Sequence, residues 1–162
     1  MKSLGYTGLL LCLCGLLLVR CTSSPDLAER YFTMPEALPD SIKTGDFLFK
    51  EGMAAYRAQE YLPAVSFFLQ VDQTTVGFDT LSFYIGVCEM ALDENERALG
   101  FLEAAEAMAS PAMRPQLLWY LALAQIKVSR NVLARRTLEQ LSKLEGPAFT
   151  SQADALLAEL GD

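Results

Sequence analysis

The chain contains no histidine, and so it lacks the commonest general base and the commonest metal ligand of proteins. Three of its four cysteines, Cys12, Cys14 and Cys21, lie in or beside an apolar leader, so no disulfide framework is expected. The sequence also has no glycine-rich phosphate loop and no cysteine or histidine spacing typical of a metal site. These absences predict a protein that is not an enzyme and binds no metal or cofactor.

Basic residues are also few, with 13 Lys and Arg against 20 Asp and Glu and a net charge of −7. An acidic domain repels phosphate backbones, so nucleic acid is not an expected partner. The remaining cysteine, Cys88, stands in an apolar stretch and is expected to be a small core residue. Glu103 and Glu106 are expected on a solvated helix face rather than in a catalytic pair.

A repeat of small and large residues organises the stretch 52–144. Each repeat has two small residues, which let two helices approach, and a large residue that fills the space beside them. The sets recur after 34 and then 36 residues: Gly52, Ala64, Phe68; Gly86, Ala98, Leu102; and Ala122, Ala134, Leu138. This period and content resemble the tetratricopeptide (TPR) repeat. The resemblance implies an all-α, right-handed solenoid of three helix-turn-helix repeats with a C-terminal capping helix.

The boundaries follow from turn and capping residues. We expect a leader over 1–21, a tether over 22–45 and a TPR domain over 46–162, whose repeats are 46–78, 79–110 and 111–146. Asp79, Asp93, Ser110 and Asn131 are expected to cap helices, with Pro111 in the first turn that follows Ser110. A final helix over 150–160 is expected to cover the third repeat with Ala153, Leu156, Leu157 and Leu160, while Asp154 and Glu159 face water.

The leader has a basic start and then an uncharged run over 4–19. As a helix this run would span about 24 Å, short of the roughly 30 Å hydrocarbon core, which is typical of a secretory signal. Leu18, three residues before Cys21, resembles a bacterial lipoprotein signal and implies lipidation of Cys21; Arg20 departs from that pattern. An uncleaved anchor, simple secretion and a buried helix are the alternatives. We expect a membrane-anchored protein of the bacterial cell envelope, with its TPR domain in the periplasm.

The tether carries adjacent aromatic residues, Tyr31 and Phe32, within the stretch 28–35. This stretch is similar to the tether of membrane-anchored TPR proteins of Bacteroidetes-type bacteria. The tether is expected to be mostly irregular, with one helical turn over 26–31. Two placements are open for the aromatic pair, because exposed paired aromatics are rare. They pack on the edge of the first repeat, or they lie in the groove as an internal pseudo-ligand.

The groove of TPR folds is lined by the first helix of each repeat. The positions that match the carboxylate-binding residues of peptide-clamping TPR domains are Phe49, Met53, Tyr84, Gln116 and Tyr120, none of them a cation. We therefore expect an apolar and aromatic groove that binds a protein or peptide. Its predicted residues are Phe49, Met53, Tyr56, Phe83, Tyr84, Val87, Met90, Trp119, Tyr120 and Leu123. The alternative is that several are core, since the first helix of repeat three is apolar nearly all round.

These features predict an interaction module that recruits a partner near the membrane, or alternatively a structural, self-associating scaffold of an envelope complex. Charge adds one pattern, since acids dominate 79–106 and bases dominate 110–144. Either these neighbouring repeats attract one another, or the third repeat offers a basic patch to an acidic partner or to anionic headgroups.

Overall fold

A computed structural model describes residues 24–38, 46–144 and 149–161. Within these ranges the chain forms eight α-helices and no β-strand. The helices are α1 (Ser24–Tyr31), α2 (Phe47–Arg57), α3 (Tyr61–Phe68), α4 (Phe78–Ala91), α5 (Asn95–Ala107), α6 (Arg114–Lys127), α7 (Asn131–Ser142) and α8 (Thr150–Leu160).

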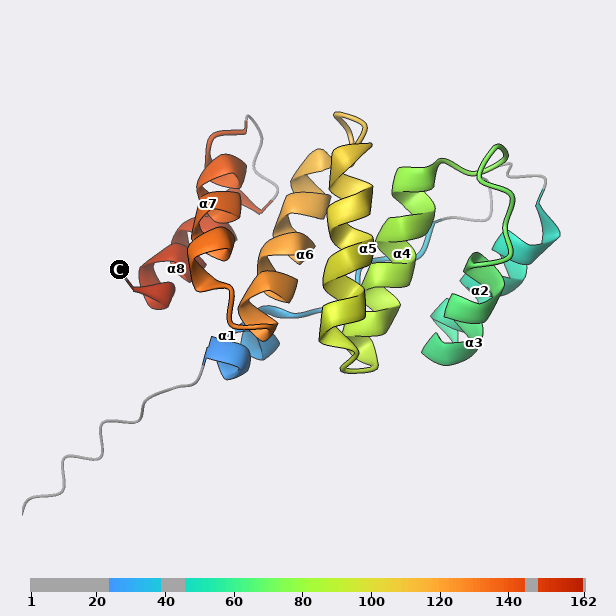
Figure 1. Cartoon of the computed structure of the whole chain (residues 1–162), viewed down its shortest axis with the longest axis horizontal. Helices are drawn as coiled ribbons and strands as arrows, with labels where there is room; N and C mark the ends of the chain where they lie inside the picture. The colour runs from blue at the N-terminus through green and yellow to red at the C-terminus, as the bar shows by residue number, and fades with distance from the viewer. Residues whose placement is uncertain (1–23, 39–45, 145–148, 162) are drawn as a thin grey trace, which may run out of the picture.

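The helices from α2 to α7 pack as three hairpins, α2 with α3, α4 with α5, and α6 with α7. Each hairpin also packs against the next one, and α8 packs against α7, so the hairpins form a row (Figure 1). Ala153 and Leu156 of α8 are fully buried. The predicted all-α, TPR-type architecture of three hairpins and a C-terminal helix is therefore confirmed.

The repeated small residues mark the closest approach within each hairpin. A Cβ atom at Gly52 would lie 2.5 Å from Cε1 of Phe68, and one at Gly86 would lie 2.7 Å from Cγ of Leu102. Real Cβ atoms do not approach other atoms that closely, so only glycine fits without a shift of its neighbour. In the third hairpin the equivalent position is Ala122, which is completely buried. The packing role predicted for the small and large residues is confirmed.

The turns inside the hairpins also repeat. Gln59, Asp93 and Ser129 have positive φ values of 61°, 59° and 62°, at the same position of each repeat. The next residue donates its N–H to a carbonyl five residues before it: Glu60 to Ala55 (2.9 Å), Glu94 to Glu89 (2.9 Å) and Arg130 to Gln125 (2.7 Å). This is a common way of ending a helix with one left-handed residue. Asp93 is therefore the left-handed residue that follows the end of α4. Its predicted role as the N-terminal cap of the next helix is wrong, because that position is taken by Glu94.

The other predicted caps are also displaced. Gly77 precedes α4, whereas Asp79 lies inside its first turn and accepts a hydrogen bond from the N–H of Ser110 (3.2 Å). Helix α6 begins at Arg114, after a turn, and carries Pro115 in its first turn in place of the predicted Pro111. The cap position of α7 is Arg130, one residue before the predicted Asn131. These differences move helix starts by a few residues and leave the hairpins unchanged.

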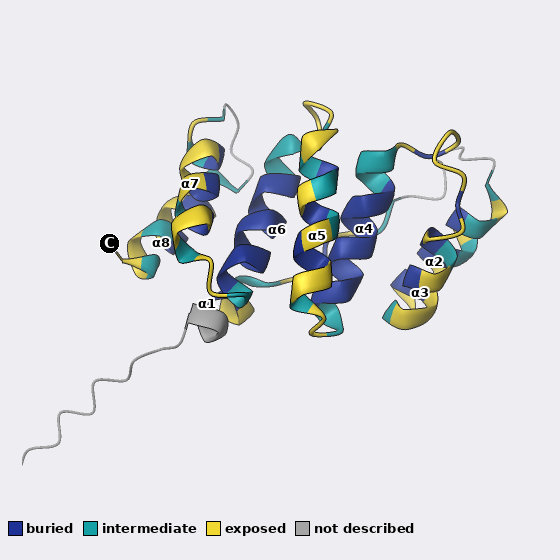
Figure 2. Cartoon of the chain, in the orientation of Figure 1, coloured by how far each residue is buried: buried dark blue, intermediate teal, exposed yellow. Residues whose placement is uncertain are grey.

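Burial is uneven along the row (Figure 2). Helices α4 and α6 are buried over most of their length, because hairpins flank them and α1 covers part of α6. Helices α3, α5 and α7 bury one side and expose the other. The first helices of the three hairpins, α2, α4 and α6, together form a surface that we call the A-helix face.

Candidate protein-interaction face

The A-helix face is already occupied by the N-terminal part of the chain. Helix α1 packs against α6, and its Leu27 and Ala28 belong to the buried core. Residues 32–38, which we call the strap, then run without regular structure across α6 and α4 toward α2 (Figure 1). The strap therefore crosses the three hairpins in the reverse of their order in the sequence.

The aromatic pair of the tether fixes the start of this path. The ring of Tyr31 meets that of Trp119 edge to face, with centroids 6.1 Å apart, and Phe32 meets Tyr120 in the same way at 6.2 Å. Such edge-to-face pairs contribute beyond the area that they bury. The placement on the edge of the first repeat is therefore wrong. The alternative placement, along the helix face, agrees with the structure.

Three tyrosine hydroxyls hold the strap by its backbone. The hydroxyl of Tyr120 donates to the carbonyl oxygen of Thr33 (2.7 Å). The hydroxyl of Tyr84 donates to the carbonyl of Glu36 (2.9 Å), and that of Tyr56 donates to the carbonyl of Pro35 (2.5 Å). At the far end, the guanidinium of Arg57 donates to the carbonyl of Leu38 (2.9 Å). Since every acceptor is a main-chain carbonyl, these contacts depend little on which side chains the bound segment carries.

The hydroxyls are suited to donate at neutral pH. Burial raises the pKa of Tyr84 and of Tyr120 to about 12, and it also raises the pKa of Tyr56. A buried phenol resists ionisation because a phenolate in an apolar environment loses its hydration. All three groups therefore keep the proton with which they hold the strap.

A charged contact ties the beginning of the strap to the C-terminal helix. The carboxylate of Glu159 on α8 accepts from the guanidinium of Arg30 (2.5 Å) and from the hydroxyl of Tyr31 (2.6 Å). The hydrogen bond from Tyr31, followed by that from Arg30, lowers the pKa of Glu159. Glu159 was expected only to face water. It is partly exposed, but it also joins α8 to α1.

The predicted groove residues do not form an open surface. All ten (Phe49, Met53, Tyr56, Phe83, Tyr84, Val87, Met90, Trp119, Tyr120 and Leu123) are buried, with at most 5% of each exposed. Several fill the space between hairpins, which is the core alternative left open by the sequence. Tyr56, Tyr84 and Tyr120 carry an apolar ring in that core and a hydroxyl at the strap. The prediction of an exposed apolar groove at these positions is corrected accordingly.

A cleft of about 490 Å³ remains beside the strap. The strap residues 33–38 form one wall, and Tyr84, Gln116, Tyr120 and Phe149 form the other. The ring of Phe149 stacks on Trp119 at 5.8 Å, which holds this wall in place. From the sequence, Gln116 was noted only because it matches a carboxylate-binding position of peptide-clamping TPR domains and is not a cation. Nothing in the sequence placed Phe149 here.

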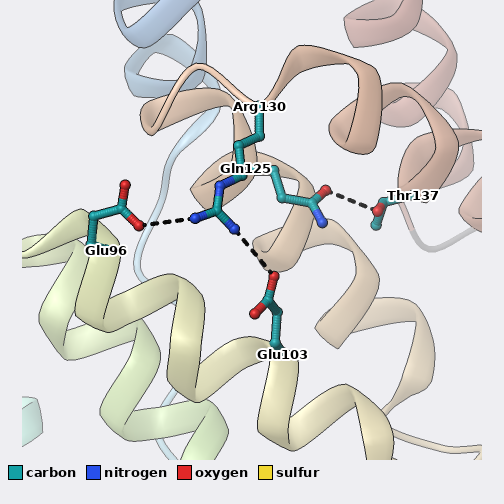
Figure 3. Close-up of polar contacts among 5 residues, drawn as sticks. All are labelled: Glu96, Glu103, Gln125, Arg130 and Thr137. Carbon is teal, nitrogen blue, oxygen red and sulfur yellow. Dashed lines mark hydrogen bonds and ion pairs between the residues drawn. The ribbon is translucent and has the colours of Figure 1, made fainter.

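The opposite charges of repeats two and three face one another. Arg130, in the turn between α6 and α7, lies 3.3 Å from Glu96 and 3.7 Å from Glu103, both on α5 (Figure 3). Two further ion pairs join the same repeats: Arg114 with Glu106 (2.9 Å) and Lys127 with Asp93 (3.1 Å). The interpretation in which neighbouring repeats attract one another is supported, and three of the bases considered for a basic patch are engaged within the chain.

Two ionisable groups of α4, Cys88 and Glu89, are buried. Cys88 is completely buried as predicted, and burial raises the pKa of its thiol to about 12, so the reactive thiolate is disfavoured. Glu89 is 1% exposed, and its carboxylate lies 2.6 Å from the guanidinium of Arg97. This contact is a charge pair rather than a well-aligned hydrogen bond. Burial raises the pKa of Glu89.

The described ranges contain no group of three or more Cys, Asp or Glu side chains arranged to hold a metal ion. Among the helices of those ranges, none has the length and apolarity needed to cross a bilayer. The leader and its candidate lipidation site, Cys21, lie outside the described residues.

Comparison with solved structures finds a likeness in fold, whereas comparison by sequence finds none. No protein-family model matches the chain, and no curated protein matches its sequence. The chain is similar in structure to the type III secretion chaperone SycD of Yersinia enterocolitica, solved in complex with a peptide of the translocator YopD. The TM-score is 0.61 at 14% sequence identity, over 78% of this chain and 96% of that one. At this identity the likeness shows a shared TPR-like helical fold.

Proposed function

We propose that this protein is a protein-interaction module that binds a segment of a partner on its A-helix face. The observation that carries the proposal is the strap itself. Seven residues of non-helical chain lie across three hairpins and are held through main-chain carbonyls by three tyrosine hydroxyls. A surface that holds one peptide in this way has donors suited to hold another.

The structural likeness to SycD supports the same proposal, because that chaperone was solved with a bound peptide. The cleft beside the strap supports it further, since a space of about 490 Å³ already lies next to two of the three hydroxyl donors, Tyr84 and Tyr120. Main-chain recognition gives affinity, and side chains of the partner that enter the cleft give specificity.

We further propose that the module acts at the bacterial cell envelope, with Cys21 as the residue that carries the lipid. The support is the sequence of the leader, with its basic start, short apolar run and cysteine. Mass spectrometry of the mature N-terminus tests this proposal. A diacylated or triacylated Cys21 at the N-terminus is the expected result, and an unmodified chain that starts at Met1 and stays in the soluble fraction would overturn it.

Photocrosslinking of the full chain in native membranes tests the interaction. A benzoylphenylalanine placed at Gln116, in the wall of the cleft, is expected to form an adduct with a partner protein. The matched control is the same probe at Val132 on α7, which is 67% exposed and outside the A-helix face. Adducts formed equally at both sites, or only at position 132, would contradict the proposal. An adduct between two copies of the chain would favour the self-associating scaffold instead.

A further inference from the structure

We propose that Tyr31 and the strap are a displaceable resident ligand of the A-helix face. The segment that replaces them belongs to a partner protein and has the same chemistry: two adjacent aromatic residues followed three residues later by proline, in an extended chain. This inference rests on the proposed function, because it names the ligand of the same face. It adds that the protein carries its own competitor.

The contacts of the strap define what a replacement must offer. Phe32 meets Tyr120 and Pro35 is buried, so these side chains are used for recognition. Thr33 and Glu36 are exposed and contribute only their carbonyl oxygens. A replacing segment therefore needs an aromatic pair, a proline and free main-chain carbonyls, while its residues at the exposed positions can vary.

The strap is also less deeply set than the helix before it. Leu27 and Ala28 of α1 are 5% and 0% exposed, whereas Phe32, Met34 and Leu38 are only partly buried. The cleft runs along residues 33–38, so one flank of the strap is open. A competitor can enter the cleft and exchange with Tyr31 and the strap one contact at a time, while the rest of α1 stays packed on α6.

The contact of Glu159 with Arg30 and Tyr31 holds the strap at its beginning. Glu159 lies on α8 and makes no contact with the tyrosine hydroxyls of α2, α4 and α6 that hold the strap. Glu159→Gln removes the charge pair with Arg30, which a competitor that begins at its aromatic pair lacks, while the amide oxygen of glutamine can still accept from the hydroxyl of a tyrosine. The change therefore loosens the resident ligand and leaves those donors unchanged. This separation gives a variant whose effect reports displacement rather than damage to the binding face.

The test is direct binding of a fluorescent peptide with the sequence of residues 31–38, measured by anisotropy on the full chain in detergent micelles. A tethered competitor acts at an effective concentration in the roughly millimolar range, so the wild-type chain should bind the peptide weakly. Phe32→Ala in the protein is expected to tighten binding at least tenfold, and Glu159→Gln by a smaller factor. A peptide with both aromatic residues replaced by alanine should bind none of the proteins.

Equal affinity for all three proteins, or binding by none of them, would overturn the inference and make the strap a permanent part of the fold. Circular dichroism of both variants shows whether the helices are retained. A wild-type dimer that the peptide dissociates would show that a second copy supplies the occupant, which also contradicts the inference. If Gln116 still captures a partner while the peptide results fail, the interaction function stands without a resident ligand. If Gln116 captures nothing, the function itself falls.

Discussion

The hydroxyl of Tyr120 donates a hydrogen bond to the carbonyl oxygen of Thr33 across a sequence separation of 87 residues. Tyr84 lies 36 residues before Tyr120, at the equivalent position of its repeat, and makes the same kind of bond to Glu36. The strap is therefore held by a feature that the repeat duplicates, which places two like donors along one face.

Alkaline pH should loosen the fold through these tyrosines. Their pKa is about 12 in the folded chain and 10.0 for the free group, so the unfolded state loses its protons first as the pH rises. Stability is therefore full below pH 10 and falls between pH 10 and 12, by about 1.4 kcal/mol per pH unit for each tyrosine. Urea unfolding at a series of pH values measures this slope. A Tyr84→Phe, Tyr120→Phe double variant should show a shallower slope, and an unchanged slope would contradict the assignment.

Two glycines on neighbouring helices should respond in opposite ways to alanine. Gly86→Ala places a Cβ 2.7 Å from Cγ of Leu102 and 3.2 Å from the carbonyl oxygen of Ala98, so a loss of about 1–3 kcal/mol in unfolding free energy is expected. Gly100→Ala on α5 meets nothing within 4 Å and should add about 0.5–1 kcal/mol through helix propensity. Thermal and urea unfolding of the two variants decide the matter, and a shift of the same sign in both would refute the close approach at Gly86.

Replacing a left-handed turn residue by glycine should stabilise the fold. Gln59 has φ of 61°, a conformation that costs a side-chain-bearing residue about 1–2 kcal/mol and glycine almost nothing. Gln59→Gly should raise the unfolding free energy by about 0.5 kcal/mol, after the greater freedom of glycine in the unfolded chain is subtracted. The control is Ala58→Gly next to it, where φ is −76° and a loss of about 0.5–1 kcal/mol is expected. Chemical denaturation that ranks the two variants in the other order would reject this reading.

The charge contacts between repeats two and three should contribute little and depend on salt. Arg130→Met removes both pairs with Glu96 and Glu103, and since all three side chains are at least 43% exposed we expect a loss below about 1 kcal/mol. The loss should shrink between low and high sodium chloride, because salt screens exposed charges. A loss of several kcal/mol that salt leaves unchanged would mean that Arg130 supports the turn in some other way.

The architecture could be predicted because it depends on residues that the repeat copies. Gly52, Gly86 and Ala122 recur with their large partners, and this pattern requires a hairpin wherever it appears. Helix starts were harder to predict, since Asp79 and Asp93 are good capping residues that the structure uses in other ways. Local preference for a cap is weak compared with the packing that sets where each helix begins.

The candidate site was harder to predict than the fold. The sequence indicated aromatic residues on the first helices, but a tyrosine that packs in the core and a tyrosine that binds a ligand look alike in sequence. Tyr84 does both, with a buried ring and a hydroxyl at the strap. Burial of the polar side chains of Glu89 and Gln125 was also not predicted. Gln125 accepts a hydrogen bond from Thr137 (2.9 Å), a pairing that becomes visible only when α6 and α7 are packed (Figure 3).

The reversed path of the strap has a consequence for how the protein matures. A ribosome makes α1 and the strap before the hairpins, and two of their docking partners, Tyr120 on α6 and Glu159 on α8, are made after α2 and α4. During synthesis the hairpins can close one by one as they emerge, and the strap can at first reach only its partners on α2 and α4, Tyr56 and Tyr84. The nascent chain therefore passes through a stage in which the face is only partly covered, and the full set of contacts forms once α6 and α8 are present.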